Sequence, residues 1–243
     1  MQPFTLLDSI LTPEGRRLSL HRRGEDFFLQ LDGEELMSSR EPGSECELAR
    51  LGCRALPRPE APRVLIGGLG FGYTLRATLA LLPPRARVVV AEIFPSVVAW
   101  NRERLPAFFS DTLRDPRVEI RVADLHSVLG EAEAYDALLL DVDNGPSAWC
   151  LEANGRLYQG AGLERLAAAL VPCGTLAVWS AYPDPVFVKR LGKAGFAAAK
   201  AHSLRSRGER GRRHTVFVAE KPRAPLGHRL RPSRGVAGLE AVG

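Results

Sequence analysis

The chain has 243 residues, of which 45% are hydrophobic and 25% charged, as in a globular protein with a substantial core. No apolar run is long enough to cross a membrane, and the N-terminus lacks a secretory-signal pattern, so we expect a cytoplasmic protein with no membrane partner. The net charge of +5 is uneven: residues 200–234 hold 11 basic and two acidic residues, and the rest is net acidic. This distribution argues against a nucleic-acid-binding surface over the body of the protein.

Neither the cysteines nor the histidines have the spacing of metal ligands. Cys46, Cys53, Cys150 and Cys173 form no C-x-x-C pair and have no histidine at a ligand spacing. We therefore expect four reduced thiols, with no metal and no disulfide framework.

The N-terminal part alternates apolar and polar residues as β-strands do. Segment 27–31 is strand-like, and the Asp32-Gly33 dipeptide after it is typical of a hairpin turn. Ser44 followed by Glu47 is a capping-box pattern, which predicts a short helix with Ser44 as its N-cap. We expect a small antiparallel β unit with one short helix.

From residue 63 to residue 219, apolar runs alternate with stretches that fit helices. The predicted strands are 64–67, 87–91, 118–122, 136–141, 174–180, 196–202 and 214–219, and the predicted helices are 73–82, 95–105, 125–131, 162–170 and 185–194. Strands separated by helices indicate an α/β fold with a mostly parallel sheet. The last two strands are joined by a link too short for a crossover helix, so we expect them to be antiparallel.

A glycine-rich turn follows the first of these strands. Gly67, Gly68, Gly70 and Gly72 lie between a buried strand and a predicted helix. Glycine allows a positive φ and lets a ligand approach the main chain, and the start of the helix offers free N–H groups. The pattern predicts a nucleoside-binding loop, with a glycine-rich turn that binds nothing as the alternative.

Acidic residues end the next three strands. Glu92 lies 20 residues after Gly72, where a carboxylate can accept both ribose hydroxyls of a nucleoside. Asp124 would orient an adenine amino group or cap the helix that begins at Leu125, and Asp141 ends the following strand. An acidic rim repels a pyrophosphate and suits a sulfonium cation, so the expected ligand is an S-adenosylmethionine-type nucleoside.

The segment 141–146 combines two carboxylates with an irregular loop. Asp141 and Asp143 end a buried strand, and Asn-Gly-Pro follows them. A transferase that acts on an amine needs a carboxylate to hold the ammonium group and to take its proton, and the two side chains can divide these tasks. A tight turn with a strand-end cap is the structural alternative. Tyr158, further along the chain, would add a hydroxyl and an aromatic wall.

These motifs, in this order, resemble the spermidine/spermine synthase family of aminopropyltransferases. The resemblance covers roughly residues 17–219 and rests on Leu31-Asp32-Gly33, Ser44-Glu45, the loop 67–72, Glu92, Asp124, the segment 141–146 and Leu157-Tyr158. It implies a Rossmann-like sheet of the S-adenosylmethionine-dependent methyltransferase type, with helices on both faces and a small N-terminal β unit. It also implies a homodimer and a site in which Asp141 activates the amine, with Asp143 beside it.

Three positions depart from the family pattern. The family's glycine loop usually carries an Asp that holds the aminopropyl ammonium of decarboxylated S-adenosylmethionine, whereas this chain has Gly70 or Phe71 there. The Gln after the D-G turn is absent, with Leu36-Met37 in its vicinity, and the Tyr-His pair before the Glu is replaced by Gly43-Ser44. These departures leave the fold and the nucleoside site intact and leave the acceptor open.

Three functions are compatible with the sequence. The first is transfer of an aminopropyl group from decarboxylated S-adenosylmethionine to a small di- or polyamine, with Asp141 removing the amine proton and Asp143 anchoring the cation. The second is methyl transfer from S-adenosylmethionine on the same scaffold, which the absent loop Asp favours. The third is a nucleoside-binding protein without catalysis. The first is preferred because the segment 141–146 and the N-terminal β unit occur together.

The chain is expected to divide into three parts. Residues 1–57 form the small β unit, residues 58–220 the nucleoside-binding catalytic domain, and residues 221–243 a basic tail whose composition predicts disorder. The basic loop at 205–213 has no aromatic residues between its arginines, so we expect a solvated hairpin tip rather than a nucleic-acid site.

Overall fold

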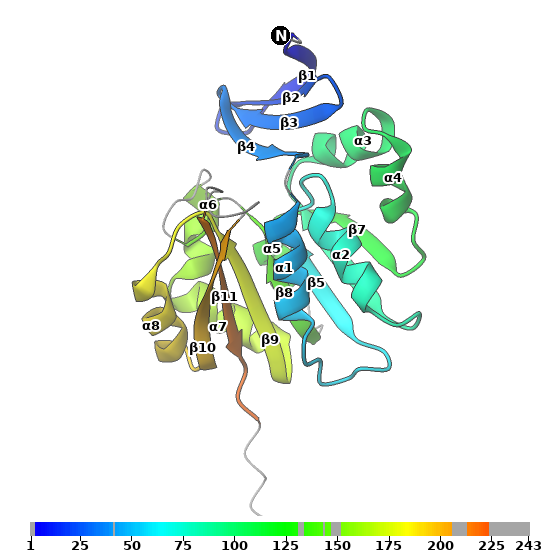
Figure 1. Ribbon diagram of the computed structural model, residues 1–243. Helices are drawn as coiled ribbons and strands as arrows, with labels where there is room; N and C mark the ends of the chain where they lie inside the picture. The colour runs from blue at the N-terminus through cyan, green and yellow to red at the C-terminus, as the bar shows by residue number, and fades with distance from the viewer. Residues whose placement is uncertain are drawn as a thin grey trace, which may run out of the picture.

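Two β-sheets, one small and antiparallel and one large and mixed, hold the strands of the protein (Figure 1). The computed structural model describes residues 3–40, 42–130, 134–142, 144–146, 152–205 and 213–223. Asp143, residues 206–212 of the basic loop and residues 224–243 of the tail lie outside the described residues. The expectations for these three parts of the chain therefore stay predictions.

The small sheet is an antiparallel meander at the N-terminus. Its strands, paired in chain order, are β1 (Thr5–Leu11), β2 (Arg17–Arg23), β3 (Asp26–Leu31) and β4 (Glu34–Ser38). Asp32 and Gly33 join β3 to β4 with φ angles of 51° and 86°, as a tight two-residue hairpin requires. The small N-terminal β unit is thereby confirmed.

The large sheet has seven strands in the order β10-β11-β9-β8-β5-β6-β7. They are β5 (Arg63–Gly67), β6 (Arg87–Glu92), β7 (Val118–Val122), β8 (Tyr135–Leu140), β9 (Leu170–Ser180), β10 (Ala197–Arg205) and β11 (Arg213–Glu220). The strands β5 to β9 run parallel, and β11 is antiparallel to both β9 and β10. The predicted α/β class and the antiparallel final pair are confirmed.

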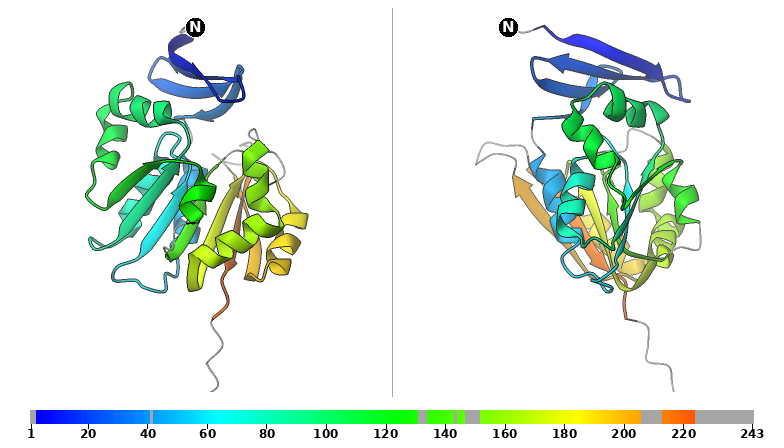
Figure 2. Two further views of the ribbon diagram at one scale, coloured as in Figure 1. Left: turned by 180° about the vertical axis from the view of Figure 1, so that it is seen from behind. Right: turned by 90° about the vertical axis from the view of Figure 1, so that its right-hand side faces the viewer.

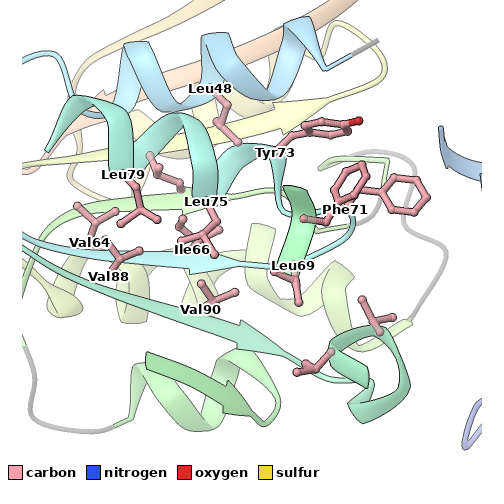
Figure 3. Close-up of a cluster of buried hydrophobic side chains, with 14 of the residues drawn as sticks. Leu48, Val64, Ile66, Leu69, Phe71, Tyr73, Leu75, Leu79, Val88 and Val90 are labelled. Atoms are coloured by element: carbon pink, nitrogen blue, oxygen red, sulfur yellow. The ribbon is translucent and has the colours of Figure 1, made fainter. Parts of the chain in front are cut away.

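Helices cover both faces of the large sheet (Figures 1 and 2). One face packs against α1 (Gly43–Gly52), α2 (Tyr73–Leu81) and α3 (Pro95–Glu103), and the other against α5 (Leu125–Leu129), α7 (Gly160–Ala169) and α8 (Pro185–Lys193). Because side chains alternate along a strand, Val64 and Ile66 of β5 pack toward α2 (Figure 3), whereas Leu65 belongs to the opposite core.

Two helical segments of the structure were not predicted from the sequence. The helix α4 (Ala107–Leu113) begins directly after Pro106, where the preceding helix was expected to have ended. The short α6 (Glu152–Gly155) and the 3-10 turn η1 (Arg156–Tyr158) lie in a stretch without a helical periodicity. Among the described residues, no helix has the length and apolar character needed to cross a membrane.

The start of α1 differs from the expectation. Its N-cap is Pro42, and no side chain caps it, so the predicted capping box of Ser44 was wrong. The Ser44 hydroxyl instead donates to Glu45 Oε2 at 2.6 Å, because the adjacent buried carboxylate needs a donor. Further along α1, a Cβ at Gly52 would collide with the Leu139 side chain of β8. The glycine therefore lets α1 lie directly on the large sheet.

Candidate active site

A cavity of about 1220 Å³ lies between the small sheet and the carboxyl ends of the central strands of the large sheet. Ligands of open α/β sheets bind at this edge. The lining residues used below are Glu34, Glu35, Met37 and Arg40 of the small sheet and its end, Glu45 of α1, Gly68, Gly70, Glu92, Asp141, Trp179, Arg213 and His214. Four sequence-predicted site residues, Gly68, Gly70, Glu92 and Asp141, thus meet in one cavity.

The glycine loop makes its turn with three left-handed residues. Gly68, Gly70 and Gly72 have φ angles of 86°, 49° and 74°. A Cβ at Gly68 would collide with the carbonyl oxygen of Asp141, and the Asn101 side chain donates to the Gly70 carbonyl at 2.8 Å. The loop therefore lies against the segment that carries Asp141, and glycine is required at position 68 by both conformation and space.

We expect Gly68→Ala to lower the free energy of unfolding by about 2–4 kcal/mol, because the new Cβ adds left-handed strain and a backbone collision. Urea denaturation measures this change. Gly192→Ala is the matched control, since a Cβ at this helical glycine meets nothing within 4 Å; its effect should be neutral or stabilising by less than about 1 kcal/mol. Equal stability of the two variants would contradict the close approach of the loop to Asp141.

Glu92 lies at the end of β6 and is 6% exposed. Its Oε2 accepts a hydrogen bond from the Leu69 N–H and its Oε1 one from the Phe94 N–H, both at 2.9 Å. Burial raises the pKa of this carboxyl, and the hydrogen bonds from the backbone N–H groups lower it. The N–H groups that hold it come from Leu69 and Gly70 of the glycine loop and from Ile93 and Phe94 after β6, so Glu92 braces the glycine loop. The sequence predicted the ligand contact but gave no sign of the loop contact.

Asp124 lies beside the main cavity. It is the N-cap of α5, and its Oδ1 accepts a hydrogen bond from the His126 N–H at 2.7 Å. A side pocket of about 40 Å³ is lined by Asp124 together with Gly68 and Glu92. The capping role considered for Asp124 is confirmed, and the residue also lines a pocket that shares residues with the main cavity.

Two carboxylates that line the cavity, Asp141 and Glu45, have raised pKa values. Asp141 follows β8, and its Oδ2 accepts a hydrogen bond from Thr74 Oγ1 of α2 at 2.5 Å. Burial and, to a lesser extent, the negative charge of Glu45 raise the pKa of Asp141 to about 7, against the opposing hydrogen bond from Thr74. Burial likewise raises the pKa of Glu45, against the hydrogen bond from Ser44. A carboxyl group that titrates near neutrality is suited to act as a general base.

Tyr158 is buried behind this segment. It is 0% exposed, its ring packs edge-on against Phe187 with centroids 5.7 Å apart, and its hydroxyl donates to the Val142 carbonyl at 3.4 Å. The side chain therefore supports the backbone that follows Asp141. Asp143, the second carboxylate of the segment 141–146, lies outside the described residues.

The small sheet covers the glycine loop with a sulfur atom. Met37 Sδ of β4 lies 3.3 Å from the Phe71 backbone nitrogen, and a Cβ at Gly70 would come within 2.8 Å of the same sulfur. A longer side chain at position 70 would therefore have to displace Met37. This contact between elements far apart in the sequence could not be predicted from either motif.

The remaining walls are aromatic and acidic. Trp179 of β9 and His214 of β11 lie with ring centroids 5.2 Å apart and their planes tilted by 33°. Five carboxylates line the cavity, against Arg40, Arg213 and His214, and Arg40 is itself paired with Asp26 at 2.7 Å. Within the described part of the chain, no group of three or more His, Cys, Asp or Glu side chains is arranged to hold a metal ion. The cavity is thus suited to an organic cation with an apolar portion.

Known proteins resemble the chain in sequence, although no family model matches it. It is 28% identical over 194 residues to a polyamine aminopropyltransferase of Synechococcus sp. (strain JA-2-3B'a(2-13)), which covers 71% of this chain and 60% of that protein. It is 29% identical over 195 residues to a polyamine aminopropyltransferase of Mycobacterium tuberculosis (strain ATCC 25618 / H37Rv), which covers 74% of this chain and 35% of that protein. The matches therefore span less than two thirds of either relative.

Solved structures share the fold. Spermidine synthase from Thermotoga maritima superposes with a TM-score of 0.71, and a spermidine synthase in complex with the transition state analogue AdoDATO with 0.73. Each match has 20% sequence identity and covers 91% of this chain and 75% of the other. The methyltransferase-like α/β sheet with a small N-terminal antiparallel sheet is therefore shown.

Proposed function

We propose that this chain, a divergent spermidine synthase-like protein, transfers an aminopropyl group from decarboxylated S-adenosylmethionine to a small di- or polyamine. The observation that carries the proposal is the position of Asp141. Its carboxyl, with a pKa of about 7, lines the same cavity as the glycine loop and Glu92. This shared cavity supports a proton acceptor beside a nucleoside site, which is the arrangement that group transfer from a nucleoside to an amine requires.

The donor would lie along the glycine loop. In this proposal Gly67, Gly68, Gly70 and Gly72 form the turn that the nucleoside approaches, Glu92 accepts the ribose hydroxyls, and Asp124 contacts the adenine from the side pocket. The small side pocket shared by Gly68, Glu92 and Asp124 supports this arrangement. A nucleoside with a sulfonium cation suits the carboxylates of the cavity.

The acceptor would react at Asp141. The carboxylate takes a proton from the ammonium group, and the neutral amine then attacks the aminopropyl carbon bonded to sulfur. A carbon–nitrogen bond forms, the carbon–sulfur bond breaks, and its electron pair stays on sulfur, so methylthioadenosine leaves uncharged. Asp143 would anchor the cation, and Tyr158 would hold the Val142 backbone in place, as its hydrogen bond to the Val142 carbonyl supports.

The assembly and location that we propose are those of a cytoplasmic homodimer with no nucleic-acid partner. Phe4, Leu6 and Leu11 flank or belong to the outer strand β1 and are 43%, 54% and 64% exposed, which supports a contact between copies. We further propose that the chain divides into three parts, residues 1–57, 58–220 and 221–243.

Methyl transfer from S-adenosylmethionine is the second candidate, because the glycine loop offers no carboxylate of its own. Gly70 has no side chain, and Met37 covers it. The loop therefore gives no direct preference for a donor without a carboxylate, and the preference would have to come from the other acidic groups of the cavity.

Calorimetric titration with the two donors tests the proposal. We expect decarboxylated S-adenosylmethionine to bind more tightly, because the acidic cavity repels the carboxylate of S-adenosylmethionine. Glu92→Gln should weaken both donors alike, by about 10-fold or more, since it removes a charged acceptor of hydroxyls. Tighter binding of S-adenosylmethionine would favour methyl transfer, and binding of neither donor to folded protein would overturn the nucleoside site.

A further inference from the structure

Glu45 is a buried carboxylate with no task in the reaction proposed above. It is 6% exposed and lines the cavity together with Asp141. Its Oε2 accepts the Ser44 hydroxyl at 2.6 Å. Its own backbone N–H also donates to it. A buried carboxylate remains costly in free energy, so its position in the same cavity as Asp141 calls for an account of what it does there.

The surroundings of Glu45 come from several elements. The helix α1 packs against α2, β8, β9 and β11. The titratable or charged groups that neighbour Glu45 are Cys46 and Glu47 of α1, Tyr73 and Arg76 of α2 and Asp141 after β8. From the other elements around α1, His214 of β11 lines the same cavity, and Asp26 of β3 acts on Tyr73. The charge of Glu45 contributes to raising the pKa of Asp141, Tyr73 and Cys46, in each case after burial as the larger cause. The negative charge of Glu45 therefore acts on Asp141, which lines the cavity.

We propose that Glu45 is a positioning residue for proton transfer at Asp141: its buried negative charge strengthens Asp141 as a base toward the acceptor ammonium. This inference rests on the proposed function. The proton passes from the ammonium nitrogen to the Asp141 carboxylate, leaving a neutral amine and a carboxylic acid. Glu45 does not receive the proton and touches no reacting atom.

The physical reason is repulsion between like charges at one site. Two neighbouring carboxylates do not both ionise readily, so one of them titrates at a higher pH than it would alone. Replacing Glu45 by glutamine keeps its size and removes its charge. Burial of Asp141 and the Thr74 hydrogen bond would remain, so the Asp141 pKa should fall while staying above its ordinary value.

Titration of Asp141 in the ligand-free protein tests the inference without any assay of activity. Aspartate labelled with ¹³C at the side-chain carboxyl reports the midpoint by NMR, and Asp141→Asn assigns the signal. We expect Glu45→Gln to lower the midpoint by about one pH unit. Glu47→Gln is the matched control, because Glu47 lies two residues away and pairs with the exposed Arg50 at 2.7 Å; it should leave the midpoint unchanged.

A second variant covers the case in which Glu45→Gln does not fold. Ser44→Ala removes the hydroxyl that stabilises the charge of Glu45, so Glu45 should protonate more readily and the Asp141 midpoint should again fall, by less. An unchanged midpoint in a folded Glu45→Gln protein, or in Ser44→Ala when Glu45→Gln does not fold, would overturn the inference, whatever reaction the protein catalyses.

The pH dependence of turnover gives the second readout. In Glu45→Gln the acid limb of kcat should move to lower pH with the Asp141 pKa, and the plateau of kcat should fall more than KM changes, because Asp141 has become a weaker base. If Glu45 had only a structural role, the substitution would lower kcat at every pH and the acid limb of the pH profile would not move. If the wild type transfers no aminopropyl group, the proposed function fails and the NMR titration alone decides the role of Glu45.

Discussion

Asparagine in place of Asp141 is expected to slow aminopropyl transfer by about 1000-fold, because the amide cannot take the proton of the acceptor ammonium. The amide keeps the size of the carboxylate and can still accept the Thr74 hydrogen bond. The rate of methylthioadenosine release measures the change. A rate within about fivefold of wild type would remove Asp141 from the chemistry, since general-base catalysis contributes at least about 100-fold.

Two controls separate chemistry from folding. Thr74→Val keeps the carboxylate and removes only its hydrogen bond, so its rate should fall far less than that of Asp141→Asn.

The folded-state pKa of Asp141 is about 7, above the value of about 4 in an unfolded chain. Its contribution to stability is therefore full below pH 4 and is lost as the pH rises to about 7. Asparagine does not ionise, so Asp141→Asn does not lose stability as the pH rises. The variant should be at least as stable as wild type at pH 8.

Asp136→Ala is expected to lower the free energy of unfolding by about 2–4 kcal/mol, because it removes a fully buried charged acceptor, although its partner Arg58 is 46% exposed. Asp136 is 0% exposed at the start of β8. Its Oδ1 accepts hydrogen bonds from the Arg58 N–H and Nε, at 3.1 and 2.8 Å. Its Oδ2 accepts from Arg58 Nη2 and the Arg63 N–H, at 2.8 and 2.7 Å. Alanine would leave these donors without their acceptor.

The control for Asp136→Ala is an ion pair at the surface. Asp26→Ala removes the partner of Arg40, in a pair whose side chains are 36% and 43% exposed, and should cost less than about 1 kcal/mol. Urea denaturation of both variants gives the comparison. If Asp136→Ala also lowers the free energy of unfolding by less than about 1 kcal/mol, Asp136 does not anchor the segment that precedes β5 against β8.

Much of the cavity wall that the large sheet contributes could be predicted, because its residues follow strands. Glu92 and Asp141 come at the ends of parallel strands, and those ends meet at one edge of the sheet. The glycine-rich loop could be located for the same reason, because it follows β5, the strand that lies between β6 and β8. Fold class was equally accessible, since buried strands and helices alternate in the sequence with different periods.

The other side of the cavity depends on contacts between distant elements. Glu45 lines the same cavity as Asp141 only because α1 lies on the large sheet, and Met37 covers Gly70 only because β4 lies above the loop. The Ser44-Glu45 dipeptide was visible as part of a family resemblance, but the capping-box interpretation assigned its hydroxyl to the wrong partner. Tyr158 shows the reverse case: it follows the segment 141–146 in the sequence and was expected to line the site, but its side chain is buried behind Val142.

Identification of the products by mass spectrometry tests the central claim most directly. The purified protein is incubated with decarboxylated S-adenosylmethionine and a panel of diamines and polyamines, and separately with S-adenosylmethionine and the same amines. We predict methylthioadenosine and an amine heavier by one aminopropyl group in the first reaction only, with Asp141→Asn forming neither. A methylated amine with S-adenosylhomocysteine in the second reaction, or no product from a protein that binds the donor, would contradict the proposal.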